Sequence, residues 1–148
     1  MKIISGGQTG VDRGALDAAI ELGMNHGGWC PQGRTAEDGR IPDRYELRET
    51  DSSDYPVRTE RNVLDGDATL ILCRCPLSGG TELTLRLAEQ HRRPRLVVDL
   101  DGGVEPAEVR RWLEDNAVEV LNVAGPRESQ SPGIADRARE FLVRMFRG

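Results

Sequence analysis

The chain alternates along its whole length between short apolar runs and segments with helical periodicity. The clearest apolar run is Ala68–Cys73 (ATLILC), which is flanked by turn-forming residues. The last periodic segment carries one continuous apolar stripe of Ile134, Ala138, Phe141, Leu142 and Met145. This alternation predicts an α/β fold, a Rossmann-like three-layer sandwich in which helices cover both faces of a mainly parallel sheet.

The same patterns predict where the individual elements lie. Asp54 and Pro56 are typical of a helix start, and so are Ser131 and Pro132. Strands are expected over Lys2–Ser5, 25–29, Ala68–Cys73, Arg95–Asp99 and Val118–Val123, and helices over Thr9–Leu22, Tyr55–Leu64, Thr81–His91, Pro106–Asn116 and the segment after Pro132. Parallel strands end along one edge of such a sheet, and ligands bind there.

Size and charge exclude several classes of protein. The 148 residues suit one domain, 1–148, with a single core, and the net charge of −5 argues against a general nucleic-acid binder. The chain turns polar soon after its first residues, MKIIS, so we expect neither a signal peptide nor a membrane span. The three cysteines include no CxxC pair, which argues against a disulfide framework. We therefore expect a cytoplasmic protein.

Two glycine-rich turns carry the main functional signal. Ser5-Gly6-Gly7-Gln8-Thr9-Gly10 joins the first expected strand to a helix, and Ser78-Gly79-Gly80-Thr81 does so after the strongest strand. Glycine lets the backbone N–H groups approach a ligand, and the N-terminus of the following helix favours an anion. Thr9 is expected to cap the first helix, and Arg13 to reach the anion. Because both turns lie at one edge of the sheet, they predict a site for a phosphate-bearing or oxyanion ligand, although each alone can be an ordinary tight turn.

Further candidate residues surround these turns. Arg58 lies on the helix before the strongest strand, where a solvated basic face is the alternative interpretation. The aperiodic segment from Cys30 to Asp54 is typical of a functional loop, and its Arg34 can close over an oxyanion or simply lie on a charged surface. Arg127 and Ser129 leave the last strand toward the same edge. Cys73 and Cys75 form a CxC pair, for which buried cysteines are a better interpretation than a metal site.

Five blocks of sequence, taken together, resemble the molybdenum carrier family (molybdenum-cofactor carrier proteins). That family lies within a larger Rossmann-like SLOG group that also contains lysine-decarboxylase-like enzymes. The resemblance spans essentially the whole chain. The blocks are SGGQTGVDRGALDAA, GWCPQGRTAEDGRIP, YPVRTERNV, LSGGTELT and NVAGPRESQSPGI.

The resemblance implies a parallel Rossmann-like sheet, a homo-oligomer (dimer or tetramer), and binding of the molybdenum cofactor (molybdopterin) or molybdate. A nucleotide-binding sensor of the same fold is the alternative. Neither catalytic nor metal-ligating residues are assigned. The ligand-binding set taken from the turns and the resemblance comprises Gly6, Gly7, Gln8, Thr9, Gly10, Arg13, Arg34, Arg58, Ser78, Gly79, Gly80, Thr81, Glu82, Arg127 and Ser129.

The related enzymes that release a base from nucleoside monophosphates carry a PGGxGTxxE pattern and an arginine on the preceding helix. This chain matches the arginine with Arg58 and the Gly-Thr pair with Gly80-Thr81, but Thr84 stands where the pattern has Glu. Glu82 is two residues earlier and therefore faces about 200° away around a helix. The sequence thus favours a binding protein over a phosphoribohydrolase.

Overall fold

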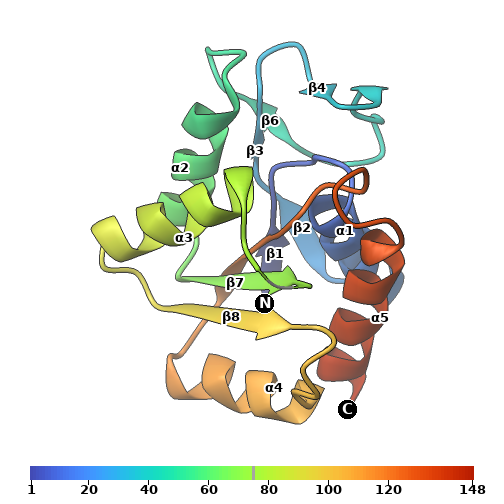
Figure 1. The fold of residues 1–148 in the computed structure, drawn as a ribbon, viewed down its shortest axis with the longest axis vertical. Coiled ribbons are helices and arrows are strands. Elements are labelled where there is room, and N and C mark those ends of the chain that lie inside the picture. Colours follow the sequence, from blue (N-terminus) through green and yellow to red (C-terminus); the bar gives the residue numbers. More distant parts are fainter. Residues whose placement is uncertain (75) are drawn as a thin grey trace.

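The computed structural model describes residues 1–74 and 76–148. Its centre is a five-stranded sheet in the order β2-β1-β9-β7-β8, in which every pairing is parallel (Figure 1). All six residues of β7 are buried, as expected for a continuous apolar strand inside a parallel sheet. The strands are β1 (Lys2–Ile4), β2 (Asn25–Gly27), β7 (Ala68–Cys73), β8 (Arg95–Asp99) and β9 (Val120–Ala124).

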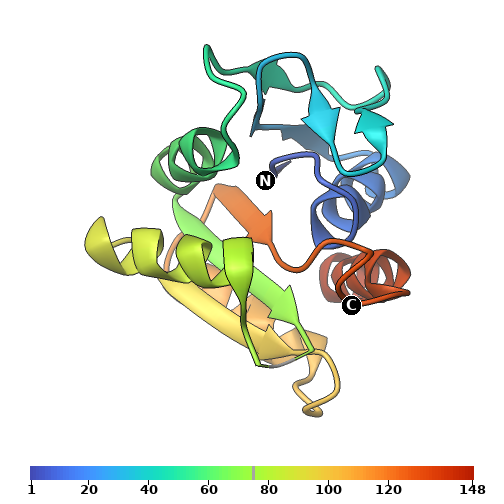
Figure 2. The same ribbon diagram turned by 45° about the horizontal axis from the view of Figure 1, so that its top comes forward.

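Helices cover both faces of this sheet, so the predicted α/β sandwich is confirmed. On one face α5 packs against both α1 and α4, and on the other α2 packs against α3 (Figures 1 and 2). The main core forms where the apolar stripe of α5 meets α1, α4 and the strands. The helices are α1 (Val11–Leu22), α2 (Tyr55–Asp65), α3 (Gly79–Gln90), α4 (Pro106–Asp115) and α5 (Ile134–Arg147).

The order of the strands determines where a crevice opens. The connection through α1 leads from β1 outward to β2, whereas the connection through α3 leads from β7 outward to β8 at the opposite edge. These two helices lie on opposite faces of the sheet (Figure 2). The chain therefore diverges beyond the carboxyl ends of β1, β9 and β7, which is where open α/β sheets bind ligands.

The aperiodic segment from residue 30 to 54 is folded rather than extended. It contains a parallel pair, β3 (Trp29–Cys30) with β6 (Arg48–Glu49), and an antiparallel pair, β4 (Thr35–Ala36) with β5 (Gly39–Arg40). Its side chains form a second small core against α1, made of Leu16, Cys30, Ile41 and Tyr45. This segment thus covers the side of α1 that faces away from the main core.

Three local expectations were wrong. The strand expected over 25–29 is broken at Gly28, whose φ of +127° takes the chain from β2 into β3. Thr9 does not cap α1, which begins after Gly10, and Ser131 does not cap α5, which begins after Gly133. The Glu128 carboxylate instead accepts from the amides of Gly133 and Ala135 at distances of 2.5 and 3.2 Å, so it caps α5 from outside the helix.

Two further features concern membranes and metals. Within residues 1–74 and 76–148, the helices are too short or too polar to cross a bilayer. In the same part of the chain, no three His, Cys, Asp or Glu side chains gather as a metal site. Cys73 is buried at the end of β7, and its CxC partner Cys75 lies outside the described residues.

Candidate functional site

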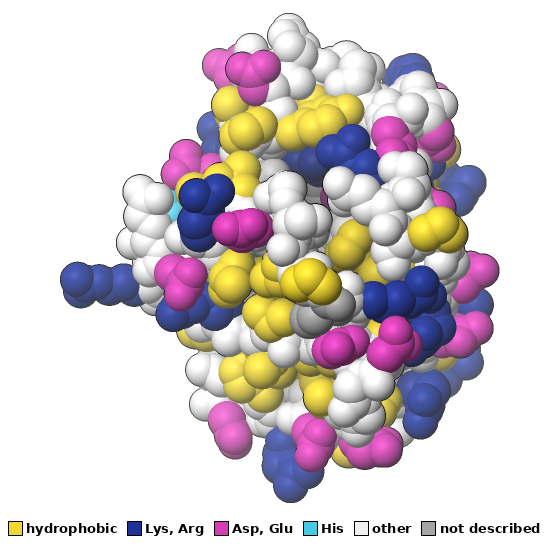
Figure 3. Space-filling model, viewed as in Figure 1, with side chains coloured by type: hydrophobic (Ala, Val, Ile, Leu, Met, Phe, Trp, Pro, Cys, Tyr) yellow, Lys and Arg dark blue, Asp and Glu magenta, His cyan; other side chains and the backbone are white. Residues whose placement is uncertain are grey.

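A pocket of about 380 Å³ opens at the carboxyl edge of the sheet, between α2, α3 and the segment that follows β9. Figure 3 shows this face, where the surface is hollowed and dark-blue Lys or Arg side chains border the hollow. Seven of the predicted ligand-binding residues line the pocket: Gly6, Gln8, Arg58, Gly79, Gly80, Thr81 and Arg127. The two glycine-rich turns therefore meet at one cavity.

The second turn presents an open helix N-terminus to this pocket. Ser78 precedes α3 in an extended conformation, and its side chain makes no capping hydrogen bond. The amides of Thr81 and Glu82 both donate to the Ser78 carbonyl, whereas the Gly80 amide has no acceptor among the described residues. Gly79 and Gly80 are exposed, and a Cβ on Gly80 would meet nothing within 4 Å. The start of α3 is thus available to an anion.

The first turn differs because its glycines are buried and several of its amides already have acceptors. The Gln8 amide donates to Asp12 Oδ2 at 3.1 Å, the Thr9 amide to Gln8 Oε1 at 3.0 Å, and the Val11 amide to the Pro126 carbonyl at 3.1 Å. Asp12 lies in the first turn of α1, so its carboxylate takes the place that an anion would occupy at an open N-terminus. The amides of Gln8, Thr9 and Val11 are therefore engaged within the protein, whereas those of Gly6, Gly7 and Gly10 have no acceptor among the described residues.

A buried ion pair connects the first turn to α2. Arg58 Nη1 lies 3.2 Å from Asp12 Oδ2, and the two side chains are 10% and 9% exposed. Gly6 makes this approach possible, because a Cβ there would lie only 1.8 Å from Arg58 Nη1. Burial raises the pKa of Asp12, while the Arg58 guanidinium acts in the opposite direction. The predicted role of Arg58 thus includes neutralising Asp12 at the pocket wall.

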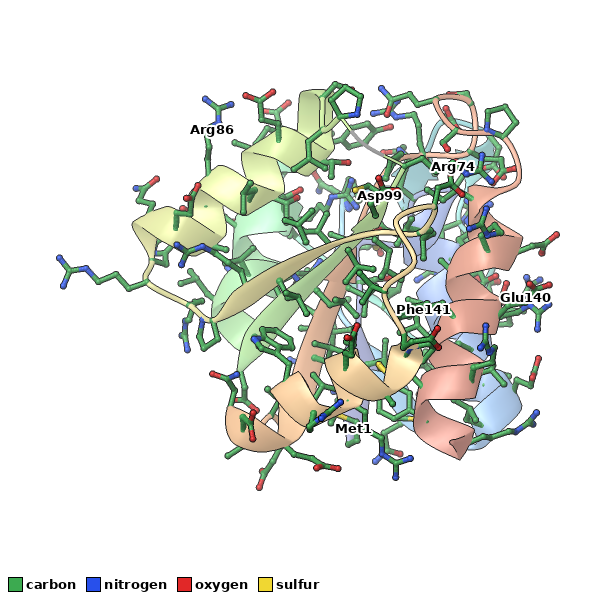
Figure 4. All side chains as sticks on the ribbon, turned by 60° about the horizontal axis from the view of Figure 1, so that its bottom comes forward. Met1, Arg74, Arg86, Asp99, Glu140 and Phe141 are labelled. Carbon is green, nitrogen blue, oxygen red and sulfur yellow. The ribbon has the colours of Figure 1, made fainter. Side chains whose placement is uncertain are left out.

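Two guanidinium groups lie near one aromatic ring at the pocket. The guanidinium carbons of Arg58 and Arg127 lie 5.3 and 5.7 Å from the centroid of the Tyr55 ring, within the range of cation–π attraction. Arg86 also borders the pocket, but it is exposed and points away from the sheet at the outer side of α3 (Figure 4). Arg58 and Arg127 therefore supply the positive charge inside the pocket.

Two acidic residues of the aperiodic segment hold Arg13 and Ser129 outside the pocket. Asp38 accepts two hydrogen bonds from Arg13, at 2.5 and 2.7 Å. Glu37 accepts from the Ser129 hydroxyl at 2.5 Å, from the Ser129 amide at 3.2 Å and from the Thr9 hydroxyl. These hydrogen bonds lower the pKa of both carboxyl groups. We call these interactions the Glu37–Asp38 contact, which fastens the segment to the first turn.

Arg34 also lies outside the pocket lining. The residue is 8% exposed, and its guanidinium donates to the backbone carbonyls of Ile41, Pro42 and Tyr45 at 2.8 to 3.2 Å, so it holds its own loop together. The remaining predicted residues outside the pocket lining are Gly7, Thr9, Gly10, Ser78 and Glu82.

Sequence reasoning missed several residues that shape the pocket. Asp12 and Tyr55 were not proposed, and neither were Asn62 and Asn122, which also line it. Asn62 is buried. Its Oδ1 accepts a hydrogen bond from the Trp29 amide and its Nδ2 donates to the Trp29 carbonyl, so it anchors β3. An acidic residue directly after a glycine-rich turn was the available signal for Asp12, because it competes with a ligand anion for the same amides.

Comparison with known proteins agrees with this architecture. The sequence profile of the circularly permutated YpsA SLOG family matches residues 3–146. The chain belongs to this family. A solved SLOG structure, the "putative molybdenum carrier protein" from Syntrophus aciditrophicus, is 46% identical and superposes with a TM-score of 0.92. The similarity covers 97% of this chain and 93% of that one. No curated protein matches the chain.

Proposed function

We propose that this SLOG protein is a carrier that holds an anionic small molecule, the molybdenum cofactor or molybdate, at the open N-terminus of α3. The observation that carries the proposal is the pocket itself, which is lined by Arg58, Arg127 and Gly80, whose amide has no acceptor among the described residues. A helix N-terminus and guanidinium groups are both suited to oxyanions. The name of the similar solved structure supports molybdenum as part of the cargo.

Binding without hydrolysis is supported by the residue at position 84. Thr84 lines the pocket, is 4% exposed and donates through Oγ1 to the Gly80 carbonyl at 2.9 Å. It therefore stabilises the first turn of α3 and offers no carboxylate for acid–base chemistry. Among the described residues that line the pocket, Asp12 is the one carboxylate, and it is paired with Arg58.

Substitution of Gly80 tests the proposed carrier function. Gly80→Asp places a carboxylate at the start of α3, in space that a side chain can occupy. It should weaken binding of molybdate, phosphate and the molybdenum cofactor by about 100-fold, equivalent to about 2.7 kcal/mol. Because acidic residues stabilise helix N-termini by about 0.3–1 kcal/mol, the melting temperature should stay constant or rise. Isothermal titration calorimetry measures the affinities.

The neutral variant Gly80→Asn is the matched control, because it adds the same bulk without the charge. It should retain affinity within about 3-fold of the wild-type protein, a difference of under 1 kcal/mol. The proposal is wrong if none of the three anions binds to the wild-type protein, or if Gly80→Asp binds them as tightly as wild type does.

A further inference from the structure

The side chain of Gln8 is buried, and the NH₂ group of its amide makes no hydrogen bond in the described structure. It is 6% exposed, and its Oε1 accepts from the Thr9 amide at 3.0 Å and the Glu37 amide at 2.9 Å. Its Nε2 is fully buried and has no hydrogen-bond partner. Among the described side chains, this is the one buried polar atom left without a partner.

The orientation of this amide is fixed by its neighbours. A 180° flip would place the NH₂ group of Gln8 against two backbone N–H donors, so Oε1 must face Thr9 and Glu37. Nε2 is then held in place with two hydrogens to donate. Burying such a donor without an acceptor is costly, and native structures keep such groups mainly where a ligand or water completes them.

Gln8 lines the same pocket as Gly80 and Arg127. Since Oε1 is engaged by the backbone, Nε2 is the polar atom of this side chain that still lacks a partner. Gln8 reaches the pocket from the β1–α1 side, whereas Gly80 reaches it from α3. A ligand that meets both must therefore extend across the cavity.

The size of the pocket agrees with an extended ligand. Its volume of about 380 Å³ corresponds to roughly a dozen water molecules of about 30 Å³ each. A tetrahedral oxyanion has four oxygens and fills only a minor part of that space. Pockets of about 300–1,000 Å³ generally hold organic molecules.

We propose that Gln8 is a specificity-determining residue, whose Nε2 donates to a ring nitrogen or carbonyl oxygen on the body of an organic phosphate while its phosphate lies at the start of α3. This rests on the proposed function, because it assumes that the pocket binds an oxyanion. It adds that the pocket discriminates an extended phosphate monoester from an inorganic anion.

The test compares inorganic phosphate with three heterocyclic phosphate monoesters: the molybdenum cofactor, guanosine 5′-monophosphate and adenosine 5′-monophosphate. In titrations of the wild-type protein, at least one ester should bind 10-fold or more tightly than phosphate does. Gln8→Glu retains the acceptor oxygen that Thr9 and Glu37 need and removes the donor. At pH 8 it should weaken that ester by at least 10-fold and phosphate by no more than 3-fold.

Gln8→Met is a second variant that removes the donor without adding charge, and it should show the same selective loss for the ester. If neither variant folds, the wild-type comparison of ester with phosphate can still overturn the inference. The inference is overturned if no ester binds more tightly than phosphate, or if the variants weaken ester and phosphate equally. If none of the four probes binds, the proposed carrier function itself is wrong. Failure of the inference about Gln8 is therefore distinguishable from failure of the proposed function.

Discussion

The two glycine-rich turns begin with the same three residues and join a parallel strand to a helix, yet the structure uses them differently. In the first turn, the glycines are buried, and the amides of Gln8, Thr9 and Val11 donate to protein acceptors, while those of Gly6 and Gly7 have none among the described residues. In the second, the Gly80 amide has no acceptor among the described residues, and the glycines are exposed at the pocket. A shared Ser-Gly-Gly pattern therefore does not specify a shared role.

The residues that follow the glycines account for the difference. Asp12 lies in the first turn of α1 and folds back to accept from the Gln8 amide, where it is neutralised by Arg58. The first turn of α3 has Glu82 as its acidic residue, but this side chain is exposed and does not return to the turn. A glycine-rich turn thus remains open to a ligand anion only when no nearby carboxylate occupies its amides.

The largest expected effect comes from removing the charge of Asp12. Asp12→Asn should lower the free energy of unfolding by about 3–5 kcal/mol, because Arg58 is then left buried without its counter-charge. Urea denaturation followed by circular dichroism measures this change. Glu82→Gln, which neutralises the acidic residue of the other helix start, is the control and should change stability by less than about 0.5 kcal/mol. Equal effects of the two substitutions would show that the two turns are not distinguished by their carboxylates.

The second glycine of each turn offers a matched pair of smaller changes. Gly7 has a φ of +78°, and a Cβ there would lie 2.6 Å from Leu47 Cδ1, whereas a Cβ on Gly80 would meet nothing within 4 Å. Gly7→Ala should therefore destabilise the protein by about 2–4 kcal/mol, through left-handed strain and overpacking together. Gly80→Ala should be neutral or stabilise by up to about 1 kcal/mol, as expected inside a helix.

Thermal denaturation of both alanine variants provides the measurement. If Gly7→Ala melts within a degree or two of wild type, the first turn is less constrained than its contacts indicate. The contrast with Gly80, on which the interpretation of the open turn depends, would then be lost.

The sequence predicted the fold well, because periodicity and glycine placement are local signals, and residues of both glycine-rich turns line one pocket. The parallel sheet, the helices on both faces and the meeting of the two turns follow from elements whose patterns repeat every two or about 3.6 residues. The roles of Arg13, Arg34 and Ser129 could not be predicted in this way. Their partners, which include Asp38, the Ile41 carbonyl and Glu37, come from an aperiodic segment whose path is set by tertiary packing.

The Glu37–Asp38 contact gives the smallest predicted effect. Its contribution to stability should depend on pH, and it involves the first turn but not the second. Hydrogen bonds from Ser129 and Thr9 lower the pKa of Glu37 below its ordinary value of 4.5, and hydrogen bonds from Arg13 lower that of Asp38 below 3.8. Each carboxylate therefore stabilises the fold above its unfolded-state pKa, and this contribution is lost as the pH falls through the lower folded-state value. Acid should thus loosen the attachment of the aperiodic segment to the first turn.

A double variant, Glu37→Gln with Asp38→Asn, tests this pH dependence. At pH 7 it should be less stable than wild type by about 0.5–1.5 kcal/mol, because both side chains are exposed and each such contact contributes little. The difference should shrink as the pH falls below 4.5, because protonation of the wild-type carboxylates removes the same interactions. Urea denaturation at each pH gives the two curves. Curves that stay parallel down to pH 3 would mean that the segment is held by its apolar core of Leu16, Ile41 and Tyr45 alone. The closed state of the first turn would then depend on Asp12 and not on the loop that covers it.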